Sequence, residues 1–296
     1  MNRTNITVVG LGNVGAQVVN LLLAAKNNIA INVMEPNEQL TGRFLDLEHA
    51  SFIHNIPLTI NQEICFLNAD IIIHTAGGNV ALGEDRNSVT SKSINIAYQV
   101  FKNKKFTNNP FIIVVSNPVD VIAYTIYKLN ITSPQKIIST GTWIDTLRLK
   151  YYLQQYHLSF DDNLMVLGEH GTDITVVYKE KKHRNFQKAI QDMLAAATTI
   201  KKTEGATKYT IANIACNLVQ CLINNQNLKA TLSVLLSNEN AAFLNTLPLF
   251  LSVPVTIKNG EIHQLLLTEI LNKNDTISLT RNAKKIYNLL HTNQLI

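Results

Sequence analysis

The feature that most constrains the fold is a glycine-rich turn near the start of the chain, Gly10-Leu-Gly12-Asn-Val-Gly15. It directly follows an apolar run, Ile6–Val9, and opens an amphipathic segment, Val14–Ala25. A strand, a tight turn and a helix in this order form the first unit of a doubly wound parallel sheet. One glycine permits the turn, one lets backbone N–H groups approach a pyrophosphate, and one lets the helix pack closely on the strand. The motif therefore predicts an α/β domain that binds a dinucleotide.

The rest of the first half continues this alternation of short apolar runs and amphipathic segments. Such alternation predicts a parallel sheet with helices on both faces. The further predicted strands are Ile29–Met34, Asp70–Thr75, Phe111–Val115 and Lys136–Ser139. The further predicted helices are Asp85–Phe106 and Val119–Lys128.

After about residue 141 the pattern becomes a mixture of long helical stretches and hairpin-like strands. The predicted helices are Ile144–Gln155, Phe186–Lys202, Thr207–Ile223 and Ser278–Leu290. The predicted strands are Leu164–Leu167, Ile174–Tyr178, Thr231–Leu236, Phe250–Ile257 and Glu261–Leu266, the last two joined by an Asn259-Gly260 hairpin turn. We therefore expect an α/β chain with a doubly wound (Rossmann) domain, residues 1–141, and an α+β substrate domain, residues 142–296.

Composition argues against several other classes of protein. The net charge of +5 is spread along the chain, and the one dense basic run, residues 179–184, lacks interleaved aromatics and indicates a solvated loop rather than a nucleic-acid site. Three cysteines without metal-ligand spacing argue against a disulfide framework or a metal site. Apolar stretches stay below the roughly 18 uninterrupted residues that a membrane helix needs. A strand that begins at Ile6 leaves no room for a signal peptide. We expect a cytoplasmic protein without nucleic-acid or membrane partners.

An acidic residue completes the dinucleotide motif. Glu35 lies 20 residues beyond Gly15, at the end of the next predicted strand, where a carboxylate accepts hydrogen bonds from the adenosine ribose. The same charge repels a 2′-phosphate, so the predicted cofactor is NAD rather than NADP. The alternative is a glycine-rich turn with an incidental surface glutamate.

The second half offers groups that suit the reduction of a 2-oxo acid, which needs a proton donor, a carboxylate clamp and a group that polarises the carbonyl. His170 follows a predicted strand and has glycines on both sides of the Glu-His pair. Asp145 and Arg148 share one helix face at i and i+3, where Asp145 could orient His170 and Arg148 could grip a carboxylate. From spacing alone a local helical ion pair is the simpler interpretation.

Two further candidates follow strands in the first half of the chain. Arg86 ends a segment with glycines at both ends, Gly77 to Gly83, which suits a mobile lid. Ser116-Asn117 ends the fifth predicted strand and offers an amide to a substrate oxygen. The alternatives are a solvated arginine at a helix start and a simple turn.

Taken together, the ordered motifs resemble the L-lactate/L-malate dehydrogenase family nearly from end to end. A set in fixed order is far more specific than any one motif. The matching segments are Gly10–Gly15, Asp46–His49, Thr75–Gly77, Gly83–Arg86, Ser116–Asp120, Asp145–Arg148, Gly168–Gly171 and Gly205–Thr207. The resemblance looks closest to the L-lactate and L-2-hydroxyisocaproate dehydrogenases within that family.

The resemblance assigns a role to each candidate. It implies that His170 donates and accepts the proton, that Asp145 orients it, and that Arg86 polarises the carbonyl. The substrate-binding residues it implies are Arg148, Asn117, Thr207 and Val80. The expected NAD-binding residues are Gly10, Gly12, Asn13, Val14, Gly15, Glu35, Thr75, Ala76, Gly77, Ser116 and Asn117.

The resemblance also implies an NAD-dependent L-2-hydroxyacid dehydrogenase that acts on pyruvate or a larger apolar 2-oxo acid. Malate dehydrogenases carry an arginine at the position of Val80, so oxaloacetate is expected to be a poor substrate. The alternatives are a malate dehydrogenase and an NAD-binding sensor without activity. Charged residues make up only 16% of the chain, which leaves room for subunit contacts, and we expect a homodimer or homotetramer.

Overall fold

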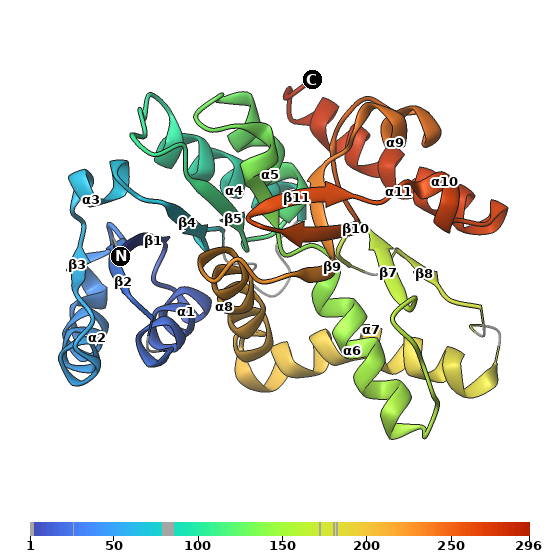
Figure 1. Cartoon of the computed structure of the whole chain (residues 1–296), viewed down its shortest axis with the longest axis horizontal. Helices are drawn as coiled ribbons and strands as arrows, with labels where there is room; N and C mark the ends of the chain where they lie inside the picture. The colour runs from blue at the N-terminus through green and yellow to red at the C-terminus, as the bar shows by residue number, and fades with distance from the viewer. Residues whose placement is uncertain (1–2, 26, 79–85, 172, 180, 182) are drawn as a thin grey trace.

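The computed structural model describes residues 3–25, 27–78, 86–171, 173–179, 181 and 183–296 (Figure 1). Its first six strands form a parallel sheet in the order β3-β2-β1-β4-β5-β6. Their bounds are β1 Thr4–Val9, β2 Ile29–Met34, β3 Leu58–Ile60, β4 Ile71–His74, β5 Phe111–Val114 and β6 Ile137–Ser139. This strand order is that of a doubly wound dinucleotide-binding sheet, which confirms the predicted fold class.

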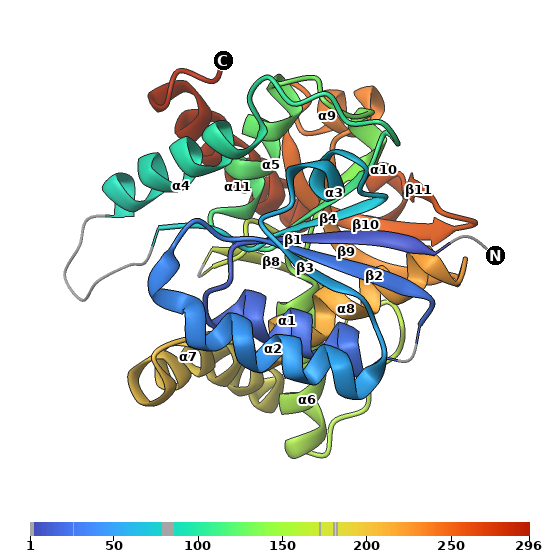
Figure 2. The same cartoon turned by 90° about the vertical axis from the view of Figure 1, so that its left-hand side faces the viewer.

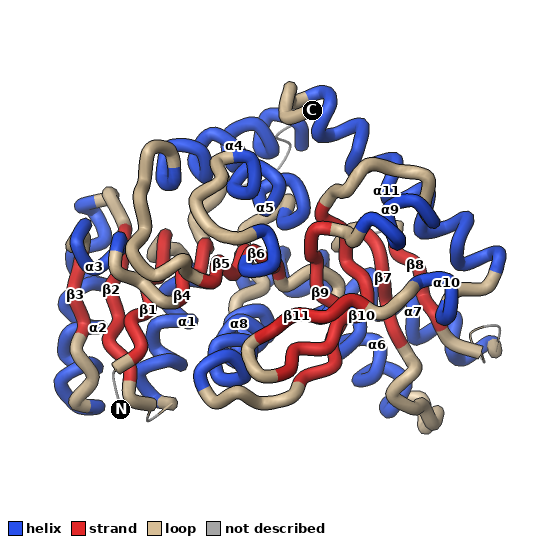
Figure 3. Tube along the Cα trace, turned by 45° about the horizontal axis from the view of Figure 1, so that its top comes forward, coloured by secondary structure: helices blue, strands red, loops and turns tan. Residues whose placement is uncertain are grey.

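Antiparallel strands continue the same sheet in the order β9-β10-β7-β8, and β11 pairs with β10 (Figure 3). Their bounds are β7 Met165–Gly168, β8 Ile174–Val177, β9 Leu228–Leu235, β10 Phe250–Lys258 and β11 Glu261–Gln264. Ser139, Ser233, Ser252 and Gly168 pair in succession across β6, β9, β10 and β7. This row brings the end of β7 level with the end of β6, so the residues that follow these two strands come together.

The helices form a layer on each face of the sheet. Their bounds are α1 Asn13–Ala24, α2 Thr41–His54, α3 Glu63–Leu67, α4 Arg86–Phe101, α5 Val119–Lys128, α6 Trp143–Gln155, α7 Arg184–Glu204, α8 Tyr209–Ile223, α9 Asn238–Phe243, α10 Leu267–Ile270 and α11 Lys273–Thr292. In Figure 2, α4, α5 and α11 lie above the sheet, and α1, α2, α6, α7 and α8 lie below it. Apolar strands buried on both faces are the expected consequence of this arrangement, and Ile72, Ile113 and Ile138 are fully buried.

The structure contains elements that the sequence did not predict. No helix or strand was predicted between Met34 and Asp70, where α2, β3 and α3 lie. The physical reason is visible in α2, which buries Leu47 but exposes Phe52 and Ile53 to solvent, so that its apolar residues do not follow one face. The short helices α9 and α10 were missed as well.

Some predicted boundaries also move. The helix predicted over Asp85–Phe106 ends at Phe101, because Asn103 takes a left-handed backbone conformation (φ 60°) that stops a helix. The hairpin turn is confirmed, since Asn259 and Gly260 both have positive φ (52° and 74°) between β10 and β11. A division of the chain at residue 141 stays a prediction.

The basic run and the cysteines can now be placed. Lys179, His183 and Arg184 are exposed, as a solvated loop requires, whereas the Lys181 ammonium group bonds to the carbonyl of Val176 and pairs with Asp275. All three cysteines are free thiols. Within the part of the chain that the structure describes, no helix is long and apolar enough to span a membrane.

Candidate active site

The glycine-rich turn lies at the carboxyl end of β1, and its three glycines meet different constraints. Gly10 has a φ of 90°, and a β-carbon there would come within 2.7 Å of the Ala76 backbone. At Gly15 a β-carbon would lie 2.0 Å from the Gly10 carbonyl oxygen, so α1 packs against the turn too closely for a side chain. A β-carbon on Gly12, in contrast, would meet no atom within 4 Å. The turn therefore leaves open space at Gly12, before the start of α1, which fits an anionic pyrophosphate.

Glu35 follows β2 and holds the turn from its side chain. Its carboxylate accepts the N–H of Leu11 at 2.8 Å and the N–H of Asn37 at 3.0 Å. Arg43, from α2, donates to the Leu11 carbonyl oxygen at 2.5 Å. The peptide groups on either side of Leu11 are thus held by an acid and a base. The arginine was not predicted, because no motif connects residue 43 with the turn.

The segments after β4 and β5 lie beside the same turn. The Thr75 hydroxyl donates to the carbonyl oxygens of Val9 and Gly10, at 2.9 and 2.7 Å. A β-carbon on Gly77 would lie 3.1 Å from that of Ser116, so these two segments are in close contact. The ends of β1, β2, β4 and β5 form one edge of the sheet, where ligands of doubly wound folds bind.

His170 and Asp145 form the central polar pair of the second half. Asp145 lies in the first turn of α6, and His170 lies two residues beyond the end of β7. The His170 Nδ1 and Asp145 Oδ2 atoms are 2.7 Å apart, with the Asp145 side chain only 6% exposed. The row of paired residues from β6 to β7 explains why positions 25 residues apart meet here. Because Nδ1 is engaged, Nε2 is the ring nitrogen that remains for proton transfer.

Asp145 also decides the charge of His170. Burial alone lowers the pKa of a histidine, and so does the nearby Arg148 guanidinium. The hydrogen bond and negative charge of Asp145, with a further contribution from Asp120, outweigh both and raise the pKa of His170 above 6.5. The imidazole is therefore adapted to carry a proton near neutral pH.

Arg148 provides a cation beside this pair. Its Nη1 lies 4.0 Å from Asp145 Oδ1, and its side chain is 10% exposed. Among the residues that the structure describes, its buried Nη2 has no hydrogen-bond partner. Burial lowers the pKa of Arg148, which Asp145 partly offsets. A buried guanidinium with a free N–H group is a strong candidate to receive a carboxylate.

Helix α11 positions the turn that carries His170. The Asn282 side chain, fully buried, accepts the N–H of Glu169 at 3.1 Å, and Gly168 has a φ of 99° where a β-carbon would strike that side chain. Lys285, one turn further along α11, pairs with the Glu169 carboxylate. Neither residue was predicted from the sequence, because an asparagine or lysine in a distant helix gives no signal of this contact.

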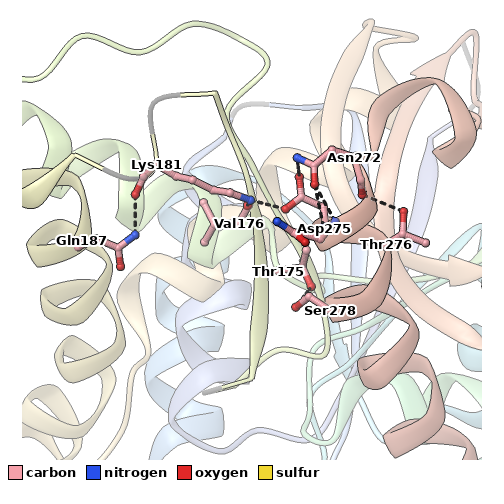
Figure 4. A network of polar contacts seen from close by, with 9 residues as sticks. Thr175, Val176, Lys181, Gln187, Asn272, Asp275, Thr276 and Ser278 are labelled. Atoms are coloured by element: carbon pink, nitrogen blue, oxygen red, sulfur yellow. Dashed lines mark hydrogen bonds and ion pairs between the residues drawn. The ribbon is translucent and has the colours of Figure 1, made fainter.

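The start of α11 is itself fixed by the polar network of Figure 4. The Asn272 side chain caps the helix by accepting the N–H groups of Asn274 and Asp275, at 2.9 and 3.0 Å. Asp275 in turn pairs with Lys181, and Thr175 of β8 bonds to Ser278 at 2.9 Å. These contacts fix the register of α11 against β8, and through Asn282 they set the position of the His170 turn.

Asp120 is a further acid, which the sequence analysis included in a matching segment without assigning it a role. It lies in the first turn of α5 and is 2% exposed. Burial raises its pKa to about 7, and the charge of Glu169 adds to the effect, while Ser233 and His170 oppose it. Its place in the segment Ser116–Asp120 was the available signal.

The remaining candidates show no contact with this centre among the described residues, or they cannot be placed. Asn117 is exposed after β5, and Thr207 lies half-buried between α7 and α8. Within the described ranges no hydrogen bond joins either residue to His170 or Arg148. Arg86 begins α4, but its side chain is not described, and Val80 lies outside the described residues.

Comparison with known proteins supports the interpretation of the first half as a nucleotide-binding region. Residues 4–139 match the family model described as lactate/malate dehydrogenase, NAD binding domain. An L-lactate dehydrogenase of Clostridium botulinum is 28% identical over 313 residues, which cover 98% of this chain and 97% of that protein.

Solved structures share the fold. The minor L-lactate dehydrogenase of Enterococcus mundtii superposes with a TM-score of 0.85 at 20% identity, covering 98% of each chain. The malate dehydrogenase of Picrophilus torridus superposes with a TM-score of 0.86 at 22% identity, covering 99% of this chain and 98% of that one. The open glycine turn fits the NAD that the family model names, and the chain is similar over nearly its whole length to an L-lactate dehydrogenase, which supports an NAD-dependent 2-hydroxyacid dehydrogenase.

Proposed function

We propose that this chain is an L-2-hydroxyacid dehydrogenase of the L-lactate dehydrogenase type, which interconverts pyruvate or a larger apolar 2-oxo acid and the L-2-hydroxy acid. The single observation that carries the proposal is the His170–Asp145 pair at 2.7 Å beside a buried arginine with an unpartnered Nη2. The similarity to L-lactate dehydrogenases over nearly the whole chain supports the choice of substrate class.

His170 moves the proton in this proposal. Bound NADH supplies the hydride that adds to the substrate's second carbon. The protonated imidazole donates from Nε2 to the carbonyl oxygen as the C–O π bond breaks, which leaves a hydroxyl group on the product and a neutral imidazole. In the reverse direction the neutral Nε2 accepts the hydroxyl proton. Asp145 keeps Nδ1 protonated in both directions and stabilises the charged ring.

Arg148 binds the substrate carboxylate. A guanidinium can hold a carboxylate through two parallel N–H bonds, which fixes the orientation of the adjacent carbonyl. The free Nη2 of Arg148 is available for such a pair, and its burial strengthens the attraction. Arg86 is proposed to polarise the carbonyl, with Asn117 and Thr207 contributing to the substrate pocket.

Val80 is proposed to contact the substrate's third carbon and to set the side-chain preference. Valine offers neither charge nor hydrogen bond, so a second carboxylate at this place would lose its hydration without a partner, at a cost of several kcal/mol. An apolar substituent would instead bury surface, at roughly 25 cal/mol per Å². Glu35 is proposed to favour NADH over NADPH by the same kind of argument, because its carboxylate repels a 2′-phosphate.

We further propose that the chain works as a cytoplasmic homo-oligomer, a dimer or tetramer. Phe52 and Ile53 on α2 are exposed by 87% and 77%, so apolar surface is available for subunit contacts. Sedimentation analysis of the purified chain tests this part independently of activity.

The substrate panel is the experiment that tests the proposal. Steady-state kcat/KM with NADH is measured for pyruvate, 2-oxoisocaproate, phenylpyruvate and oxaloacetate, and again with NADPH for the best substrate. The proposal predicts turnover of the apolar acids, poor turnover of oxaloacetate and a strong preference for NADH. Oxaloacetate reduced as efficiently as pyruvate would indicate a malate dehydrogenase, and no turnover with any acid would indicate a sensor.

The Val80→Arg variant sharpens this experiment. The introduced guanidinium should raise kcat/KM for oxaloacetate relative to pyruvate by orders of magnitude, because it pairs with the second carboxylate. Val89→Leu, a conservative change at a buried position of α4, serves as the matched control. An unchanged ratio in Val80→Arg would show that residue 80 does not contact the substrate side chain.

A further inference from the structure

Helix α6, which carries Asp145, is bonded to strand β7, which leads to His170, through one residue of that strand. The carbonyl oxygen of Val166 accepts a hydrogen bond from the Thr142 hydroxyl at 2.5 Å, and the Val166 N–H donates to the Thr146 hydroxyl at 3.0 Å. Val166 is fully buried, so its two backbone groups cannot bond to water instead. The hydroxyl groups of Thr142, which precedes α6, and of Thr146, in its first turn, thus satisfy both backbone groups of one strand residue.

The topology of the sheet explains why β7 needs these partners. On one side β7 pairs with β8, and on the other β10 meets β7 at Gly168, opposite Ser252. Among the described residues, no strand pairs with Val166 on that side, and an unsatisfied buried N–H or C=O is costly. The first turn of α6 takes the place of the missing strand at Val166.

Further hydroxyl groups tie the same turn of α6 to the sheet. The Thr146 and Thr231 hydroxyls are 3.0 Å apart, and the Thr142 N–H donates to the Ser252 hydroxyl at 3.1 Å. Thr142 and Thr146 are 0% and 6% exposed, so this connection lies in the interior. The start of α6 is therefore bonded to β7, β9 and β10, and the hydrogen bonds use hydroxyl oxygens rather than side-chain volume.

The two threonines flank Asp145 in sequence, and Val166 precedes His170 by four residues. The bonds at Val166 consequently join the two segments that present the acid and the imidazole to each other. A valine of the same shape in place of either threonine would keep the packing but leave a Val166 backbone group unpaired. The hydroxyl groups are needed for register rather than for filling space.

We propose that Thr146, with Thr142, is a positioning residue for proton transfer: its bond to Val166 holds α6 on β7 so that Asp145 stays within hydrogen-bond distance of His170. The inference rests on the proposed function for its effect on turnover, but the geometry it describes does not depend on the substrate. Neither threonine touches substrate or cofactor in this account.

The charge of His170 reports on this geometry. The charged groups around it are Asp145 and Arg148 of α6, Asp120 of α5, and the adjacent Glu169, which Lys285 of α11 pairs with. Of these, Asp145 does most to raise the pKa of His170, whereas burial lowers it. A small displacement of α6 from β7 weakens the Asp145 contribution and leaves burial in place, so the pKa of His170 falls.

The test compares Thr146→Val with Thr146→Ser and with Thr132→Val. Thr132 is a matched control, because it is also buried and its hydroxyl also bonds to a backbone group, the carbonyl of Pro110 just before β5. The titration of the His170 imidazole is followed by NMR in the protein without substrate, assigned with His170→Gln. The proposal predicts a lower imidazole pKa in Thr146→Val, a wild-type value in Thr146→Ser, and no change in Thr132→Val.

Turnover gives the second measurement. For the best 2-oxo acid, Thr146→Val should lower kcat by ~10-fold or more, because small misplacements of catalytic groups are costly, and Thr146→Ser should restore it. Binding of NADH should change by less than about twofold. An imidazole titration in Thr146→Val that matches wild type, or a failure of Thr146→Ser to restore it, would overturn the proposal.

Folding of the variants does not limit the test. Should Thr146→Val not fold, Thr142→Val removes the bond to the Val166 carbonyl instead, and the same lowered titration is expected. If no 2-oxo acid is turned over by wild type, the proposed function fails, while the NMR titration still decides whether the threonines position Asp145.

Discussion

The two halves of this molecule prepare for a ligand in opposite ways. The nucleotide half makes room by omitting side chains: Gly10, Gly12 and Gly15 form a turn in which one position is open and another is closed by packing. The catalytic half instead brings charged side chains together: His170, Asp145 and Arg148 lie in a largely buried cluster. The first arrangement depends on backbone and shape, and the second depends on charge.

Function and stability are coupled differently in the two halves. In the nucleotide half Gly15 both shapes the turn and lets α1 pack against it, so a substitution there affects folding and binding at once. In the catalytic half, residues that do not belong to the polar cluster hold it in place, such as Thr146 bonded to β7 and Asn282 of α11 bonded to Glu169. On the proposed function, a change to His170 itself removes the proton donor but leaves the hydrogen bonds that position its turn.

The largest expected effect is on turnover in His170→Gln. Loss of the proton donor should lower kcat by ~10²–10⁴-fold, the usual range for general acid catalysis. The NADH dissociation constant and the melting temperature should stay near wild type, because the glycine turn is untouched. Fluorescence titration with NADH and steady-state kinetics measure the two quantities. His263→Gln, at an exposed histidine of β11, is the control, and a His170→Gln enzyme with a third of wild-type kcat would contradict the assignment.

A pair of glycine variants tests the nucleotide half. Gly12→Ala adds a methyl group where no atom lies within 4 Å, so it should leave the melting temperature unchanged and weaken NADH binding. Gly15→Ala forces a β-carbon to within 2.0 Å of the Gly10 carbonyl oxygen. It should lower the melting temperature and weaken NADH binding as well. Overpacking costs about 1–3 kcal/mol, which corresponds to roughly 5- to 150-fold in an equilibrium constant. Equal stability of the two variants would show that α1 does not pack as described.

Much of the fold and part of the site could be predicted from sequence, for reasons that these residues illustrate. Gly10 to Gly15 and Glu35 form a local pattern, since β1, the turn and β2 are close in sequence as well as in space. The His170–Asp145 pair could not be derived from spacing, because β7 reaches β6 only through β9 and β10. The pairing was instead predicted from the resemblance to a family, through the matching segments Asp145–Arg148 and Gly168–Gly171.

Other parts of the site had no sequence signal at all. Asn282 meets Glu169 across 113 positions, and its side chain matters only because Gly168 leaves room for it. Helix α2 was missed because its apolar residues face solvent as well as the core. Contacts of this kind depend on tertiary structure, and a hydrophobic pattern in one segment does not record them.

His74, in the nucleotide half, should show a smaller pH effect, on stability, that contrasts with that of His170. His74 ends β4, is fully buried, and neither ring nitrogen has a hydrogen-bond partner among the described residues. Burial lowers the pKa of His74 to about 4, whereas the pKa of His170 is raised by Asp145 despite its burial. The two histidines therefore have opposite charge preferences in the same molecule.

Acid stability measures the difference at His74. The folded protein binds this proton less readily than the unfolded chain, so the His74 contribution is fully present above pH 6.5 and is lost as the pH falls towards 4. Relative to His74→Leu, wild type should lose about 3 kcal/mol of unfolding free energy over that range. Urea unfolding of both proteins at neutral pH and near pH 4 gives this difference. Parallel pH dependences of the two proteins would show that His74 is solvated or paired.

In the proposed reaction one proton, carried by His170 and controlled by Asp145, accompanies the hydride. The most direct test is the pH dependence of kcat/KM for 2-oxo acid reduction and for 2-hydroxy acid oxidation, in wild type and in Asp145→Asn. Reduction needs the protonated imidazole, so its rate should fall as the pH rises through a pKa above 6.5, and oxidation, which needs the neutral ring, should rise. In Asp145→Asn both transitions should move to lower pH, because burial and the Arg148 charge then lower the pKa of His170 against the smaller contribution of Asp120 alone. Transitions that run in the same direction, or that stay in place in Asp145→Asn, would contradict the account.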